Sequence, residues 1–283
     1  MNQTHIAPFH FFKMDGTGND FVIIDARARA LHLKPEEILR LSGRANTITK
    51  GCDQLIVIEK SQKADCFMRI YNSDGSEVAS CGNASRCIGW LMMKEQKKDT
   101  STFETLAGLL TATRTDKNLI QVDMGPARTE WNEIPLAHQA DTLHLPISQG
   151  PLSDPVGVSM GNPHAVFFVK DINTIDFKEL GPALEHHALF PERANIGVAQ
   201  IMASDTLRLR VFERGAGETL ACGTGACAAV VAAARRKLAG RKASVELKGG
   251  TLEIEWMPNN RVMMSGPVKL QFEGTLELET HTA

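Results

Sequence analysis

The spacing of apolar residues in the first half of the chain predicts short strands separated by glycine turns. Aromatic and β-branched residues flank Gly16 and Gly18 within residues 9–25, which indicates two strands around a tight turn. A helix is predicted over 34–42, because a proline stands in its first turn and two glutamates follow it. Further strands are predicted at 52–60 and 66–75, and a hairpin at 102–125.

The same order of elements recurs in the second half. Residues 158–169 again predict a strand, a glycine turn and a strand, and Asn162 matches Asn19 at an offset of 162 − 19 = 143. The hairpins of the two halves end in Gly-Pro pairs at 125–126 and 266–267, where 266 − 125 = 141. A shared order at a nearly constant offset indicates an internal duplication.

The duplication predicts an α+β protein with two pseudo-symmetric domains. We place the first domain at residues 1–126 and the second at 127–269, which opens with an irregular crossing that contains a strand near Leu143. The tail from about 270 to 283 has no counterpart at the end of the first half. A chain of 283 residues is long enough for two domains that each bury a core.

Two cysteines occupy equivalent places at the starts of predicted helices. Cys222 matches Cys81 at 222 − 81 = 141, and each precedes a glycine and then an apolar run. The N–H groups and the dipole at a helix N-terminus favour a thiolate, so we expect both pKa values to lie below the usual value of about 8.5. The same N–H groups can hold a carboxylate. Acidified thiols beside anion sites suggest chemistry at the α-carbon of an amino acid.

Inversion of a stereocentre needs a base on one face of the carbon and an acid on the other. One thiolate and one thiol, related by the duplication, satisfy this requirement in an active cleft at the domain boundary. His164 and Glu213 carry charge close to the matched positions and could tune the sulfurs. The remaining candidates are mostly polar and uncharged, as a zwitterion requires: Asn19, Gln54, Asn72, Gly82, Asn83, Asn162, Asn195, Arg214, Gly223 and Thr224.

The amino-acid composition limits the kinds of molecule that the protein is expected to bind. The 31 Lys and Arg against 33 Asp and Glu give no basic surface for nucleic acid, so a small molecule is expected. The first residues lack the pattern of a secretory signal, and the apolar stretch 219–234 is too short for a membrane span of roughly 20 residues. We therefore expect a cytoplasmic protein.

The other cysteines are expected to be buried thiols rather than disulfides or metal ligands. A reducing cytosol keeps thiols free, and the pairs 81/87 and 222/227 lack the close spacing of structural zinc sites. The adjacent His186 and His187 would point apart on a helix, so no metal site is expected there. The remaining cysteines are predicted to be small core residues: Cys52, Cys66, Cys87 and Cys227.

The motifs of this chain resemble those of the diaminopimelate epimerase family over essentially the whole length. They are GNDF at 18–21, DQL at 53–55, YNSDGSEV at 71–78, CGN at 81–83, MGNPH at 160–164, FPERANI at 190–196 and ERGAGETLACGTGAC at 213–227. Two departures stand out. The family usually has CGNGARC where this chain has CGNASRC, and GxGxDQ where this chain has TKGCDQ, with Thr49 in place of the first glycine.

The resemblance implies epimerisation of LL-2,6-diaminopimelate to the meso isomer, in lysine and peptidoglycan synthesis, without pyridoxal phosphate. It implies Cys81 and Cys222 as acid and base, His164 and Glu213 as groups that tune them, and the polar set above, with Glu213, as substrate contacts. In each domain a mixed sheet would wrap around a central helix, and the tail would cross back to the first domain. A homodimer is implied, with Phe272 where a Tyr is common.

Other functions remain open on the sequence alone. A racemase of another amino acid would use the same cysteines, although Arg214 favours a substrate with a second carboxylate, unless it is paired with Glu213 or Glu218. An amino acid sensor would have been expected to lose a cysteine, and a thiol redox protein would need a nearby resolving cysteine. The GTGACA run at 223–228 lacks the preceding strand that a dinucleotide site requires.

Overall fold

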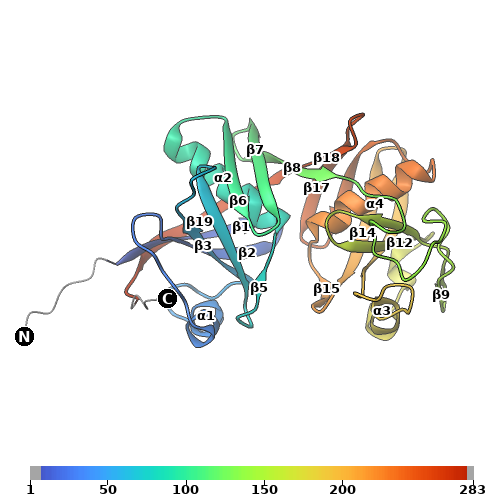
Figure 1. Ribbon diagram of the computed structural model, residues 1–283, viewed down its shortest axis with the longest axis horizontal. Coiled ribbons are helices and arrows are strands. Elements are labelled where there is room, and N and C mark those ends of the chain that lie inside the picture. Colours follow the sequence, from blue (N-terminus) through green and yellow to red (C-terminus); the bar gives the residue numbers. More distant parts are fainter. Residues whose placement is uncertain (1–7, 279–283) are drawn as a thin grey trace, which may run out of the picture. The chain divides into compact units, whose positions relative to one another are not determined.

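The chain folds into two compact units, each of which is described by itself. The computed structural model describes residues 8–278 (Figure 1). Residues 1–7, on which the expectation of no secretory signal partly rests, and 279–283 of the predicted tail lie outside the described part. The first unit contains the residues up to Ile120 and those from Pro267 onward, and the second is Gln121–Gly266. From the sequence alone, we placed the ends of the two domains at residues 126 and 269.

The first unit is a mixed sheet with one long buried helix. Its elements are β1 (Phe9–Gly16), β2 (Asn19–Asp25), α1 (Pro35–Ser42), β3 (Gln54–Glu59), β4 (Cys66–Asn72), β5 (Glu77–Val78), α2 (Gly82–Gln96), β6 (Thr100–Thr105), β7 (Gly108–Asp116) and β19 (Lys269–Leu276). The pairs β2–β3 and β4–β6 are parallel, and β1–β2, β3–β4 and β6–β7 are antiparallel. The late strand β19 pairs with β1 and so joins the sheet of the first unit (Figure 1).

The second unit repeats this plan. Its elements are β9 (Ser148–Gln149), β10 (Leu152–Ser153), β11 (Val156–Ser159), β12 (Pro163–Phe168), η1 (Ile172–Thr174), α3 (Phe177–Glu185), β13 (Asn195–Ala203), β14 (Thr206–Glu213), β15 (Gly217–Thr219), α4 (Gly223–Arg235), β16 (Lys242–Leu247) and β17 (Gly250–Trp256). Two strands link the units along the chain: β8 (Leu119–Pro126) and β18 (Arg261–Pro267). Parallel pairs again occur at β12–β13 and β14–β16, with antiparallel β13–β14 and β16–β17.

Both central helices are enclosed by their own sheets, which confirms the predicted α+β class with two pseudo-symmetric units. α2 packs on β1, β6 and β7, and α4 packs on β11, β12 and β17 (Figure 1). A helix with apolar residues on most of its sides has to be buried, and this holds for the run Ala226–Ala233 of α4. The N-terminal end of each helix is therefore positioned by the surrounding strands.

The structure corrects three details of the sequence-based expectations. The strand expected near Leu143 is a turn, because the Asp141 carboxylate accepts from the Leu143 N–H at 2.9 Å and competes with strand pairing. The helix that begins after Cys222 ends at Arg235 rather than near Gly240. Helix α3 was not predicted at all, since Gly181 and Pro182 are poor helix formers.

The packing of α2 on β7 leads to a stability prediction. A Cβ added at Gly89 of α2 would overlap the Cβ of Ala112 on β7. We expect Gly89→Ala to lower the free energy of unfolding by about 1–3 kcal/mol, as overpacked core substitutions do. The gain in helix propensity, about 1 kcal/mol, would not compensate.

Urea denaturation of the full chain measures this effect. Combining Ala112→Gly with Gly89→Ala should restore much of the lost stability. The double substitution moves one methyl group from β7 to α2 and adds none to the core. A single Gly89→Ala variant as stable as the wild type would contradict the packing described for α2.

Candidate functional site

The candidate residues of the first unit gather at one edge of its sheet. Asn19 begins β2, Gln54 begins the parallel strand β3, and Asn72 ends β4 directly opposite Gln54. Gln54 Nε2 donates to Asn72 Oδ1 at 3.0 Å. The other amide atom, Gln54 Oε1, is buried and has no hydrogen-bond partner among residues 8–278. The edge therefore offers a buried acceptor to a ligand.

Cys81 lies next to this edge, at the N-terminal end of α2. It is the N-cap residue, it is half-buried, and its Sγ lies 3.9 Å from Asn19 Oδ1. Gly82 and Asn83 form the buried first turn of the helix. Ser85 of the CGNASRC motif stands where the family usually has alanine. Its hydroxyl donates to the Cys81 carbonyl at 2.8 Å, so the added polar group has a partner within the helix.

The turn before Asn19 is held by the same helix. Thr17 and Gly18 both have positive φ, and the fully buried Arg86 of α2 donates through Nη2 to Thr17 Oγ1 at 2.7 Å. A Cβ at Gly16 would come within 3.0 Å of the Asn83 carbonyl oxygen. The close approach of this turn to α2 fixes where β2 begins.

The second unit brings together the matching set at the ends of β12, β13 and β14. His164 lies beside Asn195 in the parallel pair β12–β13, and Glu213 ends β14. Asn195 Nδ2 donates to the Pro163 carbonyl at 3.0 Å, and its Oδ1 accepts from the Arg214 N–H at 3.0 Å. Asn195, expected as a substrate contact, therefore also binds two backbone groups, the Pro163 carbonyl and the Arg214 N–H.

Cys222 caps α4 and is buried. Its Sγ lies 3.6 Å from Thr224 Oγ1, which accepts from Asn162 Nδ2 at 3.3 Å. A Cβ at Gly225 would lie 3.2 Å from this sulfur, and the Gly225 N–H instead bonds to it. Glycine at 225 therefore lets the helix backbone reach the sulfur.

The expectation of an acidified thiol is wrong for Cys222. Burial raises the pKa of Cys222 well above its ordinary value, and the charge of Glu213 raises it further. Hydrogen bonds from Thr224 and from the Gly225 N–H oppose the shift without cancelling it. Loss of hydration outweighs the helix N-terminus because this sulfur is only 4 % exposed.

Glu213 shares this environment. Burial raises the pKa of Glu213, against hydrogen bonds from Thr219 and Cys222 that lower it. Thr219 Oγ1 donates to Glu213 Oε1 at 2.5 Å. The sequence did not single out Thr219, although it belongs to the same motif. Thiol and carboxylate thus form a hydrogen-bonded pair in which burial disfavours the charge on either partner.

His164 is a neutral hydrogen-bonding group. It is fully buried, and burial together with the charge of Arg214 lowers the pKa of His164 from 6.5 to about 3. Its Nε2 lies 3.1 Å from Asn162 Oδ1, and its Nδ1 has no partner among the described residues. A chain of contacts thus connects His164 with Cys222 through Asn162 and Thr224. Any influence of His164 on the sulfur passes along that chain rather than through a positive charge.

Arg214 stands in an exposed loop whose backbone is firmly held. Its Nη1 donates to the Glu192 carbonyl at 2.9 Å, and across residues 8–278 it pairs with neither Glu213 nor Glu218. Glu185 was missed by the sequence analysis. Its buried carboxylate accepts from the Gly215 N–H at 2.8 Å and from Arg193 at 3.3 Å, so it anchors the loop that carries Arg214.

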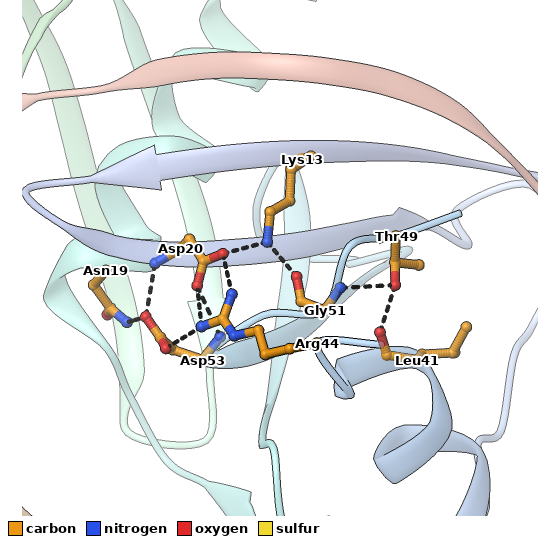
Figure 2. A network of polar contacts seen from close by, with 8 residues as sticks. All are labelled: Lys13, Asn19, Asp20, Leu41, Arg44, Thr49, Gly51 and Asp53. Carbon is orange, nitrogen blue, oxygen red and sulfur yellow. Dashed lines mark hydrogen bonds and ion pairs between the residues drawn. The ribbon is translucent and has the colours of Figure 1, made fainter. Parts of the chain in front are cut away.

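A second set of residues missed from the sequence surrounds Asn19. Figure 2 shows Lys13, Arg44 and Asp53 linked to Asn19 and Asp20 by hydrogen bonds and ion pairs. Asp20 and Asp53 lie within the GNDF and DQL motifs, but the motifs alone did not indicate a role for either carboxylate.

The departure at Thr49 has a structural explanation. Its buried hydroxyl donates to the Leu41 carbonyl at 2.6 Å and accepts from the Gly51 N–H at 3.2 Å (Figure 2). Thr49 thus ties the loop before β3 to the end of α1.

The other expectations concern single residues. The four cysteines expected in the core, Cys52, Cys66, Cys87 and Cys227, are buried and take part in no disulfide within residues 8–278, and burial raises the pKa of Cys66 to about 12. Phe272 on β19 is half-buried and meets Phe11 edge to face, with ring centroids 6.1 Å apart. Within the described chain, no three His, Cys, Asp or Glu side chains converge as a metal site would require. No described helix combines the length and apolar character needed to cross a bilayer.

The lowered pKa of His164 predicts a pH dependence of stability. Between about pH 6.5 and 3 the unfolded chain binds a proton that the folded chain excludes, so the free energy of unfolding should fall as the pH falls. The contribution is up to about 1.4 kcal/mol per pH unit. Urea denaturation at several pH values should show a shallower slope for His164→Gln. His32→Gln, at an exposed histidine, is the control, and equal slopes for the two variants would contradict the prediction.

Comparison with solved structures places the fold. The chain superimposes on a predicted epimerase from Pseudomonas aeruginosa with a TM-score of 0.68 at 15% identity, covering 96% of this chain and 100% of the other. It matches a PhzF-family phenazine biosynthesis protein from Bacillus anthracis with a TM-score of 0.66 at 17% identity, covering 96% and 100%. At these identities the likeness concerns the fold alone.

Comparison of sequences gives the family. The sequence model of the family described as diaminopimelate epimerase matches residues 11–130 and 156–271. Diaminopimelate epimerase from Acidiphilium cryptum is 52% identical over 94% of this chain and 96% of its own length. The enzyme of the same name from Phenylobacterium zucineum is 51% identical over 94% and 97%. The chain therefore belongs to the diaminopimelate epimerase family.

Proposed function

We propose that this protein interconverts LL-2,6-diaminopimelate and meso-diaminopimelate in lysine and peptidoglycan biosynthesis, with Cys81 and Cys222 as acid and base and without pyridoxal phosphate. The observation that carries the proposal is the equivalence of the two halves. In each, a cysteine caps a buried helix beside amide side chains at the ends of neighbouring strands. Membership of an isomerase family supports the reaction class.

The reaction transfers a proton on each face of the α-carbon. One cysteine, as thiolate, takes the α-proton, so a C–H bond breaks and an S–H bond forms. The other cysteine, as thiol, delivers its proton to the opposite face, where an S–H bond breaks and a C–H bond forms. The charge that develops as the α-proton leaves is stabilised by N–H groups at the helix starts, near Gly82 and Gly223. The roles of the two sulfurs exchange when the reaction runs backwards.

Glu213 is the group that makes Cys222 a base. As a carboxylate hydrogen-bonded to the thiol, Glu213 can take the proton of Cys222 and leave the sulfur as the thiolate. Burial raises the pKa of Glu213 and so makes this carboxylate a better proton acceptor than an exposed one. His164 supports this pair by fixing the Asn162 amide toward Thr224.

Recognition of the substrate falls to the remaining polar set. The buried Gln54 Oε1, which has no hydrogen-bond partner in the described part of the chain, suits the substrate ammonium group. The exposed Arg214 suits the distal carboxylate, which it can clamp with two parallel hydrogen bonds. Asn195 contributes by holding the Arg214 backbone. The proposed substrate contacts are Asn19, Gln54, Asn72, Gly82, Asn83, Asn162, Asn195, Glu213, Arg214, Gly223 and Thr224.

The protein is further proposed to act in the cytoplasm as a homodimer. Six cysteines that form no disulfide within residues 8–278 suit a reducing compartment. Phe272 is only half covered within its own unit, on the outer part of the cluster that contains Phe11, and so has surface left for a second copy.

Single cysteine variants test the function. Purified, reduced protein without pyridoxal phosphate should form meso-diaminopimelate from the LL isomer, and Cys81→Ala and Cys222→Ala should each lower the rate by at least about a hundredfold, as loss of a general acid or base does. Cys87→Ala is the matched control, because Cys87 is a buried cysteine of the same helix as Cys81. Near-normal turnover in either of the first two variants would refute the two-base assignment.

A further inference from the structure

The side-chain amide of Asn19 is fixed in one orientation by Asp53. Asn19 Nδ2 donates to Asp53 Oδ2 at 2.9 Å (Figure 2). Asn19 Oδ1 lies 3.9 Å from Cys81 Sγ, within the range of a hydrogen bond from sulfur. An ionised carboxylate only accepts hydrogen bonds, so it can face the NH₂ group of the amide but not its oxygen. The oxygen is therefore turned toward Cys81.

Asp53 is itself held from several directions. Its Oδ2 accepts from the Asp20 N–H at 3.0 Å, and its own N–H donates to Asp20 Oδ1 at 3.0 Å. Arg44 bridges the two carboxylates, with Nη2 at 2.8 Å from Asp20 Oδ1 and 2.5 Å from Asp53 Oδ1. The buried Lys13 pairs with Asp20 and donates to the Gly51 carbonyl, as Figure 2 shows.

The charges of this network reinforce one another. Burial tends to raise the pKa of Asp20, but hydrogen bonds from Arg44 and Lys13 outweigh it and hold that pKa well below the ordinary range. Two cations thus face two carboxylates, which fixes the geometry around Asn19 more firmly than a single exposed ion pair would.

The second unit has no counterpart of the network. The positions that match Asp20 and Asp53 are Pro163 (163 − 20 = 143) and Ala194 (194 − 53 = 141). There Asn162 Oδ1 faces His164, and Nδ2 points to Thr224 beside Cys222. Asn19 therefore turns its amide oxygen toward Cys81, whereas the matching Asn162 turns its amide nitrogen toward the Thr224 hydroxyl beside Cys222.

We propose that Asp53 is a positioning residue that keeps the carbonyl oxygen of Asn19 toward Cys81 and so keeps Cys81 a thiol while no substrate is bound. A hydrogen bond accepted from the thiol stabilises the neutral form, whereas an N–H group in that place would stabilise the thiolate. The inference rests on the proposed function in one respect, because it makes Cys81 the acid of the resting enzyme.

The test measures alkylation of Cys81 by iodoacetamide as a function of pH in the substrate-free protein, followed by mass spectrometry of the Cys81 peptide. Asp53→Ala frees the Asn19 amide to rotate. We expect the apparent pKa of Cys81 to fall by about half a unit, so that alkylation near pH 7 becomes roughly threefold faster. Asp116→Ala is the matched control, since it removes one exposed carboxylate of the same unit away from Asn19.

A double-variant cycle separates positioning from simple loss of charge. In an Asn19→Ala background, Asp53→Ala should no longer change the alkylation profile, because the amide through which it acts is gone. An equal effect in both backgrounds, or no effect of Asp53→Ala in the wild type, would overturn the inference. Asp53 is 42 % exposed, so we expect the variants to fold, and Asp53→Asn provides a second, more conservative substitution.

Apart from the substituted Asp53 or Asp116, the charged and titratable groups around Cys81 stay in place in each arm of the test. Those on the strands that pack against α2, on α2 near its start, and on the Asn19 network are His10, Lys13, Asp15, Asp20, Arg44, Asp53, Arg86, Glu104, Arg114 and Asp116. Alkylation needs no substrate, so its outcome is independent of the epimerase assay. A protein that responds as expected but leaves diaminopimelate unchanged would refute the proposed function and leave this inference intact.

Discussion

Each half of the molecule depends on a helix that is enclosed by its own sheet and begins at a cysteine. Because α2 and α4 are covered by strands on most sides, their N-terminal ends cannot shift without disturbing the core. Small residues make this enclosure possible: Gly89 allows β7 to approach α2, and Gly225 allows the backbone to reach the sulfur of Cys222. The positions of the two sulfur atoms are thus a consequence of packing.

The two halves share a topology but differ in the electrostatics of their cysteines. Cys222 is buried against Glu213, and burial raises the pKa of both groups. Cys81 is half-buried, and an amide oxygen oriented by a network of four charged residues faces it. A duplicated fold can thus place its two cysteines in different electrostatic environments while keeping the backbone nearly the same.

Much of this organisation could be predicted from the sequence. The constant offset between matched residues gave the duplication, the order of strands and the positions of both cysteines, since strand and helix starts follow from local spacing. The pKa of Cys222 could not be predicted in the same way, because helix position is a local property whereas burial and the charge of Glu213 depend on the complete fold. The roles of Asp53 and Glu185 were missed for a similar reason: each acts through partners that only the folded chain brings near.

The central claim is that two different groups handle the proton on the two faces of one carbon. The most direct test is the reaction of LL-diaminopimelate in D₂O, analysed at low conversion by mass spectrometry of product and remaining substrate. The account predicts that the meso product carries one solvent deuterium at the inverted α-carbon, while remaining LL substrate is largely unlabelled, because the incoming hydrogen comes from the second cysteine. Meso product that retains the original α-hydrogen would mean that a single group removes and returns the proton, and would contradict the account.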